Sequence, residues 1–134
     1  MKEDELISKG YEIRNAKITH VDLSMEDHGV MVLSLVLDGC GWGCNYGGYV
    51  IGKGYVGADY FEGSAKGMES IMQIMDVVGV ERFNDMKGKY VRCAIKGWGK
   101  SVKVIGNIIE NKWFDIESFF AESEIKVDGK KNTR

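Results

Sequence analysis

The chain of 134 residues, with 44% hydrophobic and 28% charged residues, has the size and balance of one globular domain. Its formal net charge of −2 argues against duplex DNA as a partner, because proteins that bind DNA need a basic surface to displace counterions. No apolar run approaches the roughly 20 residues that cross a bilayer, and residues 1–10 lack the cationic start and apolar stretch of a secretory signal. We therefore expect a cytoplasmic protein that works without a membrane and keeps its three cysteines as free thiols.

The first half of the chain predicts strands joined by glycine-rich connections. Apolar residues alternate imperfectly over 11–23 and run almost continuously over 30–38, and the turn residues between them indicate a β-hairpin. A glycine loop is expected next, over 39–48, and a second loop over 52–63. Between these loops lies a short third strand at 49–51, which starts at Tyr46 at the earliest.

The second half predicts helices around another hairpin. Ser64 is a suitable N-cap and Gly79 a suitable C-terminal glycine for a helix between them. Its expected buried stripe is Met68, Ile71, Met72, Met75 and Val78. The remaining expected elements are a helical turn at 80–88 with Val80, Phe83 and Met86 inward, strands at 89–96 and 101–108 joined by a turn at 97–100, and a helix at 113–122 with Trp113, Ile116, Phe119 and Phe120 inward.

This order, β-β-β-α-α-β-β-α, predicts an α+β fold with an antiparallel sheet of about five strands and helices on one face. Residues 1–122 are expected to form the single domain. Residues 123–134 form a polar tail that ends in Lys-Lys-Asn-Thr-Arg.

Two nucleotide-binding patterns occur in unsuitable contexts. Gly52, Gly54 and Gly57 satisfy the dinucleotide fingerprint, but six residues separate them from the expected helix. Residues 97–101 resemble the end of a Walker A loop, but Ala94 stands where that loop needs glycine and a β-branched strand follows. We interpret both as turns.

Metal or catalytic chemistry has little support. Cys40 and Cys44 form a single pair whose spacing is not repeated, and Asp27 and His28 are adjacent on a turn. No base is marked out beside Cys93, which lies on an expected strand. We predict no metal, no cofactor and no enzymatic activity.

The clustering of glycine is the most informative feature. Ten of the 18 glycines fall between Gly39 and Gly67, interleaved with aromatic residues that include Trp42, Tyr46 and Tyr49. One interpretation is a wide hairpin whose rings complete the core. The other is a ligand site in which backbone amides bind an anion, rings stack on a base, and the helix that begins near Ser64 attracts phosphate.

Several segments together resemble a family of small phage-encoded proteins. The similar segments, within residues 13–114, are Asn15-Ala16-Lys17-Ile18, Glu26-Asp27-His28-Gly29, Tyr46-Gly47-Gly48-Tyr49, Ser64-Ala65-Lys66-Gly67-Met68, Val78-Gly79-Val80 and Lys87-Gly88-Lys89-Tyr90-Val91-Arg92. The family resembles the anti-Thoeris sponges, which sequester a cyclic ADP-ribose isomer made by bacterial defence enzymes in pockets between subunits. The resemblance implies ligand contacts at the Gly-Gly-Tyr segment and near Phe83. Cys40, Cys44 and the extra glycines at 52–57 depart from the family pattern.

These observations predict a phage protein of the host cytoplasm that sequesters a small nucleotide messenger, as a homo-oligomer. Tyr46, Tyr49 or Phe83 would stack on the base. The phosphates would be held by the amides of Gly47 and Gly48 with Lys66 and Arg92. The alternative is an accessory protein that binds a host or phage protein through exposed Trp42 or Trp98.

Overall fold

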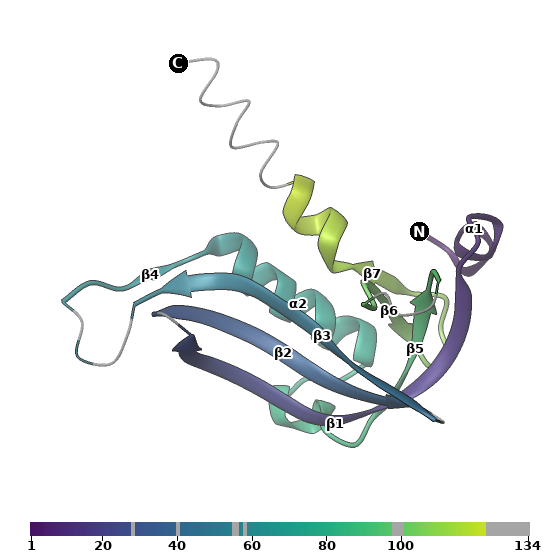
Figure 1. Ribbon diagram of the computed structural model, residues 1–134, viewed down its shortest axis with the longest axis horizontal. Coiled ribbons are helices and arrows are strands. Elements are labelled where there is room, and N and C mark those ends of the chain that lie inside the picture. The colour runs from purple at the N-terminus through teal and green to yellow at the C-terminus, as the bar shows by residue number, and fades with distance from the viewer. Residues whose placement is uncertain (28, 40, 55–56, 58, 98–100, 123–134) are drawn as a thin grey trace, which may run out of the picture.

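One antiparallel sheet dominates the computed structural model, which describes residues 1–27, 29–39, 41–54, 57, 59–97 and 101–122. The strand order is β4-β3-β2-β1-β5-β6-β7, and α2 runs along one face of the sheet (Figure 1). The strands are β1 (Glu12–Asp27), β2 (Val30–Gly39), β3 (Trp42–Lys53), β4 (Glu62–Gly63), β5 (Tyr90–Ile95), β6 (Val104–Asn107) and β7 (Trp113–Asp115). The helices are α1 (Glu3–Ser8), α2 (Ala65–Val78), the 3-10 helix η1 (Phe83–Met86) and a helical segment at 116–122.

The α+β class and the antiparallel sheet are confirmed, but the expected strand count was too low. The described residues form seven strands, because β4 and β7 are only two and three residues long and leave little periodic signal. The helix α1 was also missed. Its Leu6 is 2% exposed and packs on Ala94 and Val104, which alternate along β5 and β6 with residues that face α2. The short α1 therefore covers the sheet face opposite α2.

The glycine segment at 39–48 is for the most part a strand, which corrects the expectation of a loop. The strand β3 pairs with β2 from Trp42 onward, and its register shifts near Gly47 and Gly48, whose φ angles are 104° and 84°. A Cβ atom on Gly47 would lie 2.5 Å from the carbonyl oxygen of Leu33. The glycines therefore bend the strand through a bulge and do not release it from the sheet.

The ends of α2 are as predicted, but of its expected buried stripe only Val78 is buried, while Ile71 and Met75 pack partly buried against the core. The Ser64 hydroxyl accepts a hydrogen bond from the Gly67 amide, and Gly79 has a φ of 90°. The buried residues of α2 are Gly67, Ser70, Ile74, Val77 and Val78, whereas Met68 and Met72 are 60% and 63% exposed. The reason is the close approach at Gly67, where a Cβ atom would lie 2.5 Å from the Cβ of Ile51. Because Gly67 has no side chain, the side of α2 that contains it packs on β3, and the side that contains Met68 and Met72 faces the solvent.

The C-terminal part differs from the expected helix at 113–122. Trp113–Asp115 pair with β6 as β7, and the helical segment starts only at residue 116. Ile116 and Phe119 are nevertheless buried, as expected, whereas Trp113 and Phe120 are only partly buried; Phe114 is buried without having been expected. The expected turn at 80–88 is confirmed as η1, with Met86 fully buried. Most of the Walker-like turn, at 98–100, and the tail at 123–134 lie outside the described residues.

Candidate functional site

A cleft of about 530 Å³ opens at the end of the sheet where β1 and β3 begin and β5 ends. Strands that are distant in sequence supply its walls, together with Gly97, Ser101 and Val102 from the stretch between β5 and β6. The described lining residues are Gly10, Glu12, Arg14, Trp42, Gly43, Cys44, Ile95, Gly97, Ser101 and Val102. We call this site the Trp42 cleft.

The indole of Trp42 is placed by a glycine on the neighbouring strand. Gly39 of β2 is the register partner of Trp42, and a Cβ atom on Gly39 would lie 2.0 Å from the indole ring. The ring therefore lies flat against the backbone of β2, which only glycine permits at this distance. This arrangement holds an aromatic surface at the edge of the Trp42 cleft.

Charge in the cleft comes from the start of β1. Arg14 is the register partner of the buried Cys93, and its guanidinium pairs with Glu12 at 3.0 Å. The side chains of Arg14 and Glu12 are 33% and 61% exposed. A planar cation with its counterion therefore borders the same cavity as the indole.

The two described cysteines are poor nucleophiles. Burial raises the pKa of the Cys44 thiol, and a backbone hydrogen bond from Val102 only partly opposes this effect. Burial, and then the neighbouring Cys44, raises the pKa of Cys93 to about 12. Because the thiolate is the reactive form, neither group is activated at neutral pH. Within the described ranges, no three His, Cys, Asp or Glu side chains form a group that could hold a metal ion.

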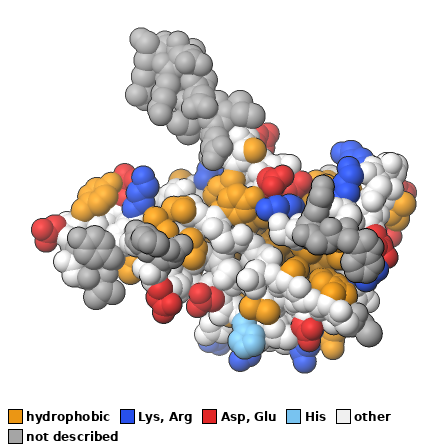
Figure 2. Space-filling view, viewed as in Figure 1, with side chains coloured by type: hydrophobic (Ala, Val, Ile, Leu, Met, Phe, Trp, Pro, Cys, Tyr) orange, Lys and Arg blue, Asp and Glu red, His pale blue; other side chains and the backbone are white. Residues whose placement is uncertain are grey.

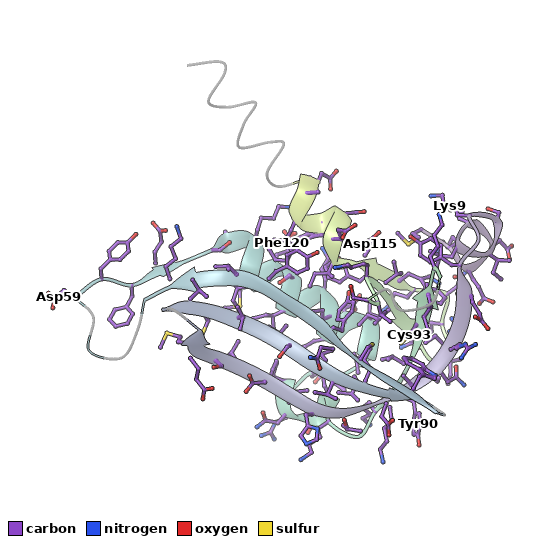
Figure 3. All side chains as sticks on the ribbon, viewed as in Figure 1. Lys9, Asp59, Tyr90, Cys93, Asp115 and Phe120 are labelled. Carbon is purple, nitrogen blue, oxygen red and sulfur yellow. The ribbon has the colours of Figure 1, made fainter. Side chains whose placement is uncertain are left out.

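Two of the predicted stacking residues are committed to the core. Tyr46 is 1% exposed, and its hydroxyl donates a hydrogen bond to the carbonyl oxygen of Phe114 at 3.2 Å. The ring of Tyr49 stacks on Phe120, which lies over β3 (Figure 3), with ring centroids 4.8 Å apart and planes 5° apart. Tyr46 is fully buried and one face of the Tyr49 ring is covered by Phe120, so neither ring offers much surface to a base.

The other predicted contacts on the α2 side are also occupied. Lys66 pairs with Glu69 at 3.7 Å and lies 4.1 Å from the ring centre of Phe119. Phe83 is half-buried against the main core. Gly47 sits in the bulge against β2, and Gly48 is exposed with open space around it.

Arg92 lies on the opposite sheet face and is held by several groups. Its guanidinium donates to Glu3 at 2.5 Å, to the carbonyl oxygen of Asn107 at 2.7 Å and to that of Glu110 at 2.9 Å. It also lies 4.7 Å from the ring centre of Trp113. The structure therefore brings Tyr46, Tyr49 and Lys66 toward the segment 116–122, but it places Arg92 apart from them.

The sequence reasoning missed the contribution of β1. Arg14, Ala16 and Ile18 are alternate residues along β1, so the three side chains lie on the same face of the sheet. Ala16 and Ile18 are 2% and 0% exposed. A charged residue that continues a buried apolar face is a signal of a site at the edge of the core. Trp42 was named among the rings of the glycine segment and as a candidate protein anchor, but it was not among the predicted stacking residues, because its segment was interpreted as a loop.

Comparisons with family models, with curated proteins and with solved structures found no match to this chain. In the part of the chain that the structure describes, no helix has the length and apolar character needed to span a membrane. The resemblance to phage sponge proteins thus stays a prediction.

Proposed function

We propose that the protein binds a small nucleotide of the cyclic ADP-ribose type in the Trp42 cleft and holds it without converting it. The observation that carries this proposal is the placement of an indole and a guanidinium on the walls of one cavity of about 530 Å³. That volume is within the range of roughly 300–1,000 Å³ typical of ligand pockets. The ligand class agrees with the sequence prediction, whereas the contacts move from the Gly-Gly-Tyr segment to the start of β1 and β3.

Each wall suits one part of such a ligand. The indole of Trp42 offers a flat apolar surface to a base. The guanidinium of Arg14 offers paired N–H donors to a phosphate. Because Arg14 already donates to the Glu12 carboxylate, the phosphate would compete with that carboxylate for the guanidinium. Ile95 and Val102 add apolar side chains to the lining of the same cleft.

Retention is favoured over turnover by the chemistry of the cleft. Cys44 is the thiol among the described residues that line the cleft. Burial raises its pKa, so at neutral pH it stays protonated and is a poor nucleophile. A role in sequestration requires only that the complex dissociate slowly. By analogy with the phage family that the sequence resembles, the site of action would be the host cytoplasm.

A homo-oligomer is part of the proposal. Among the described residues, β3 pairs with β4 only at Gly52 and Lys53, so its stretch from Trp42 to Ile51 has a strand partner on one side only. This stretch carries no charged residue and no proline, the usual protection of an open edge. A second copy that approaches this edge would deepen the Trp42 cleft.

The test is titration calorimetry with cyclic ADP-ribose isomers and cyclic oligonucleotides. We expect binding that Trp42→Leu weakens by about tenfold or more, since an aromatic contact is worth roughly 1–3 kcal/mol per base. The matched control is Tyr90→Leu, which changes an aromatic residue 54% exposed at the other end of β5 and should leave the affinity unchanged. Ligand recovered intact after denaturation would support retention. The absence of heat and of any melting shift with every ligand would refute the proposal.

The alternative, binding of a protein partner, is favoured by a different surface, the apolar groove at the far end of the sheet beside the start of α2.

A further inference from the structure

An apolar groove of about 300 Å³ lies between the end of the β1–β2 hairpin and the start of α2. Hydrophobic side chains are visible on the surface at the end of the molecule where β4 lies (Figure 2). The lining residues are Leu23, Met25, Met31, Ile51, Gly52, Lys53, Phe61, Glu62, Gly63, Ser64, Met68 and Ile71. We call this surface the Met groove, and Met72 extends it by one helical turn of α2.

The large side chains around the Met groove are unusually exposed. Phe61 is 64% exposed, Met68 60%, Met72 63% and Leu23 44%. Exposed apolar residues that are scattered singly need no explanation, but a contiguous set bordering a groove marks a binding surface. The core does not need these methionines, because α2 packs on β3 through the side that contains Gly67.

The composition of the groove favours an adaptable partner contact. Four of the seven methionines of the chain, Met25, Met31, Met68 and Met72, gather here. Methionine is flexible and polarizable, and surfaces rich in it accept apolar side chains of varied shape. Met68 and Met72 form an i, i+4 ridge along the groove, as in helix-on-helix packing.

The charges around the groove select the partner. Three carboxylates lie in it or next to its residues in the chain, at Glu26, Glu62 and Glu69, against the amine of Lys53 in the groove and that of Lys66, two residues from Met68. Lys66 is already paired with Glu69. A second copy of this chain would bring the same acidic rim against itself, which opposes self-association here.

We propose that the Met groove docks a basic amphipathic helix of a partner protein. The apolar face of that helix, with anchors at i, i+3, i+4 and i+7 spacing, would lie on Met68, Met72 and Phe61, and its lysines or arginines would face the carboxylates. The groove is separate from the Trp42 cleft. Along β1, Leu23 lies nine residues from Arg14, or about 30 Å at the rise of an extended strand.

The test uses the full chain and a fluorescein-labelled peptide of about 18 residues, or five helical turns, built from leucine and lysine with leucine on one face. Fluorescence anisotropy should show binding by the wild type. The variant Met68→Gln/Met72→Gln should bind at least about tenfold more weakly, because it makes the ridge polar at exposed positions without loss of helix propensity. The matched control is Ile109→Gln, which changes a residue that is 85% exposed at the β6–β7 turn and should bind like the wild type.

Two further peptides distinguish specific docking in the Met groove from nonspecific hydrophobic binding. A leucine–glutamate peptide of the same pattern and a leucine–lysine peptide of scrambled order should both bind at least about tenfold more weakly than the first. Equal binding of the three peptides, no binding of the basic peptide, or unchanged binding by Met68→Gln/Met72→Gln would overturn the proposal. So would sedimentation of the wild type as a dimer that this variant dissociates. Because none of these readouts involves a nucleotide, failure here and failure of the Trp42 cleft are distinguishable.

Discussion

Two tryptophan–arginine arrangements in this molecule share one construction and differ in what surrounds them. In each, an indole lies flat on a glycine of the neighbouring strand: Trp42 on Gly39, and Trp113 on Gly106, where added Cβ atoms would lie 2.0 and 2.3 Å from the rings. Arg92 stands over Trp113 with its donors used by Glu3 and two backbone carbonyls, and its side chain is 14% exposed. The Trp42 indole instead borders a cavity that Arg14 and Glu12 also line.

These two arrangements show that residue type alone does not mark a ligand site. Arg92 was predicted to hold a phosphate, yet its guanidinium is bound by Glu3 of the helix α1 and by Glu110 of the β6–β7 turn. Its contacts tie the N-terminal helix to the sheet. Arg14 lies at the start of β1 on the face opposite α1 and lines the Trp42 cleft, so a ligand in that cleft can reach it. We expect mutations of the Arg92 arrangement to affect stability, and mutations of the Trp42 cleft to affect binding.

The largest expected effect is that of Arg92→Met. It leaves Glu3 and the carbonyl groups of Asn107 and Glu110 without their donor, which should lower the free energy of unfolding by about 2–4 kcal/mol. Urea denaturation measures it. The matched variant Arg14→Met should cost less stability, since its side chain is 33% exposed, and should instead weaken ligand binding. Equal losses of stability in the two variants would erase the proposed contrast.

A matched pair of glycine substitutions should sharpen the comparison. Gly106→Ala forces a Cβ atom into the ring of Trp113 inside a closed contact, and we expect a loss of about 1–3 kcal/mol. Gly39→Ala should cost less, because the Trp42 ring can turn toward the cleft, and should disturb ligand binding more. Denaturation gives the stabilities, and fluorine NMR with 5-fluorotryptophan reports which indole moves. A shift of the Trp113 resonance in Gly39→Ala would contradict the independence of the two arrangements.

The smallest expected effect is a pH dependence that comes from the core behind these sites. Cys93 has a pKa of about 12 in the folded protein, against 9.0 when unperturbed, so above pH 9 the folded state holds a proton that the unfolded state releases. Stability should therefore fall as pH rises from 9 toward 12, by at most about 1.4 kcal/mol per pH unit. Urea midpoints between pH 8.5 and 9.5 measure this slope, below the unperturbed pKa of 10.0 at which the hydroxyl of Tyr46, whose pKa burial raises in the folded protein, begins to add to it. In Cys93→Ala the slope should shrink, and an unchanged slope would assign it to other groups.

Much of the framework followed from local sequence signals. Ser64 and Gly79 fixed the ends of α2, because capping depends on the few residues around each end. Alternation gave β1, β2 and the β5–β6 hairpin, and the register partners are those of a simple antiparallel order. Short elements were not predictable: β4, β7 and α1 are stabilised by pairing or by a single buried contact such as Leu6.

Local patterns along the chain are enough to specify an α+β domain with a capped helix and a glycine-rich, aromatic central segment. That this segment is a bulged strand, which turns Tyr46 into the core and leaves Trp42 at a cleft, follows from long-range contacts. Such contacts also decide which face of α2 is buried, since the approach of Gly67 to Ile51 leaves Met68 and Met72 at the surface. The physical reason is the same in both cases. The burial of a side chain depends on which distant strand or helix packs against its segment. The spacing of residues along one segment does not specify that long-range contact.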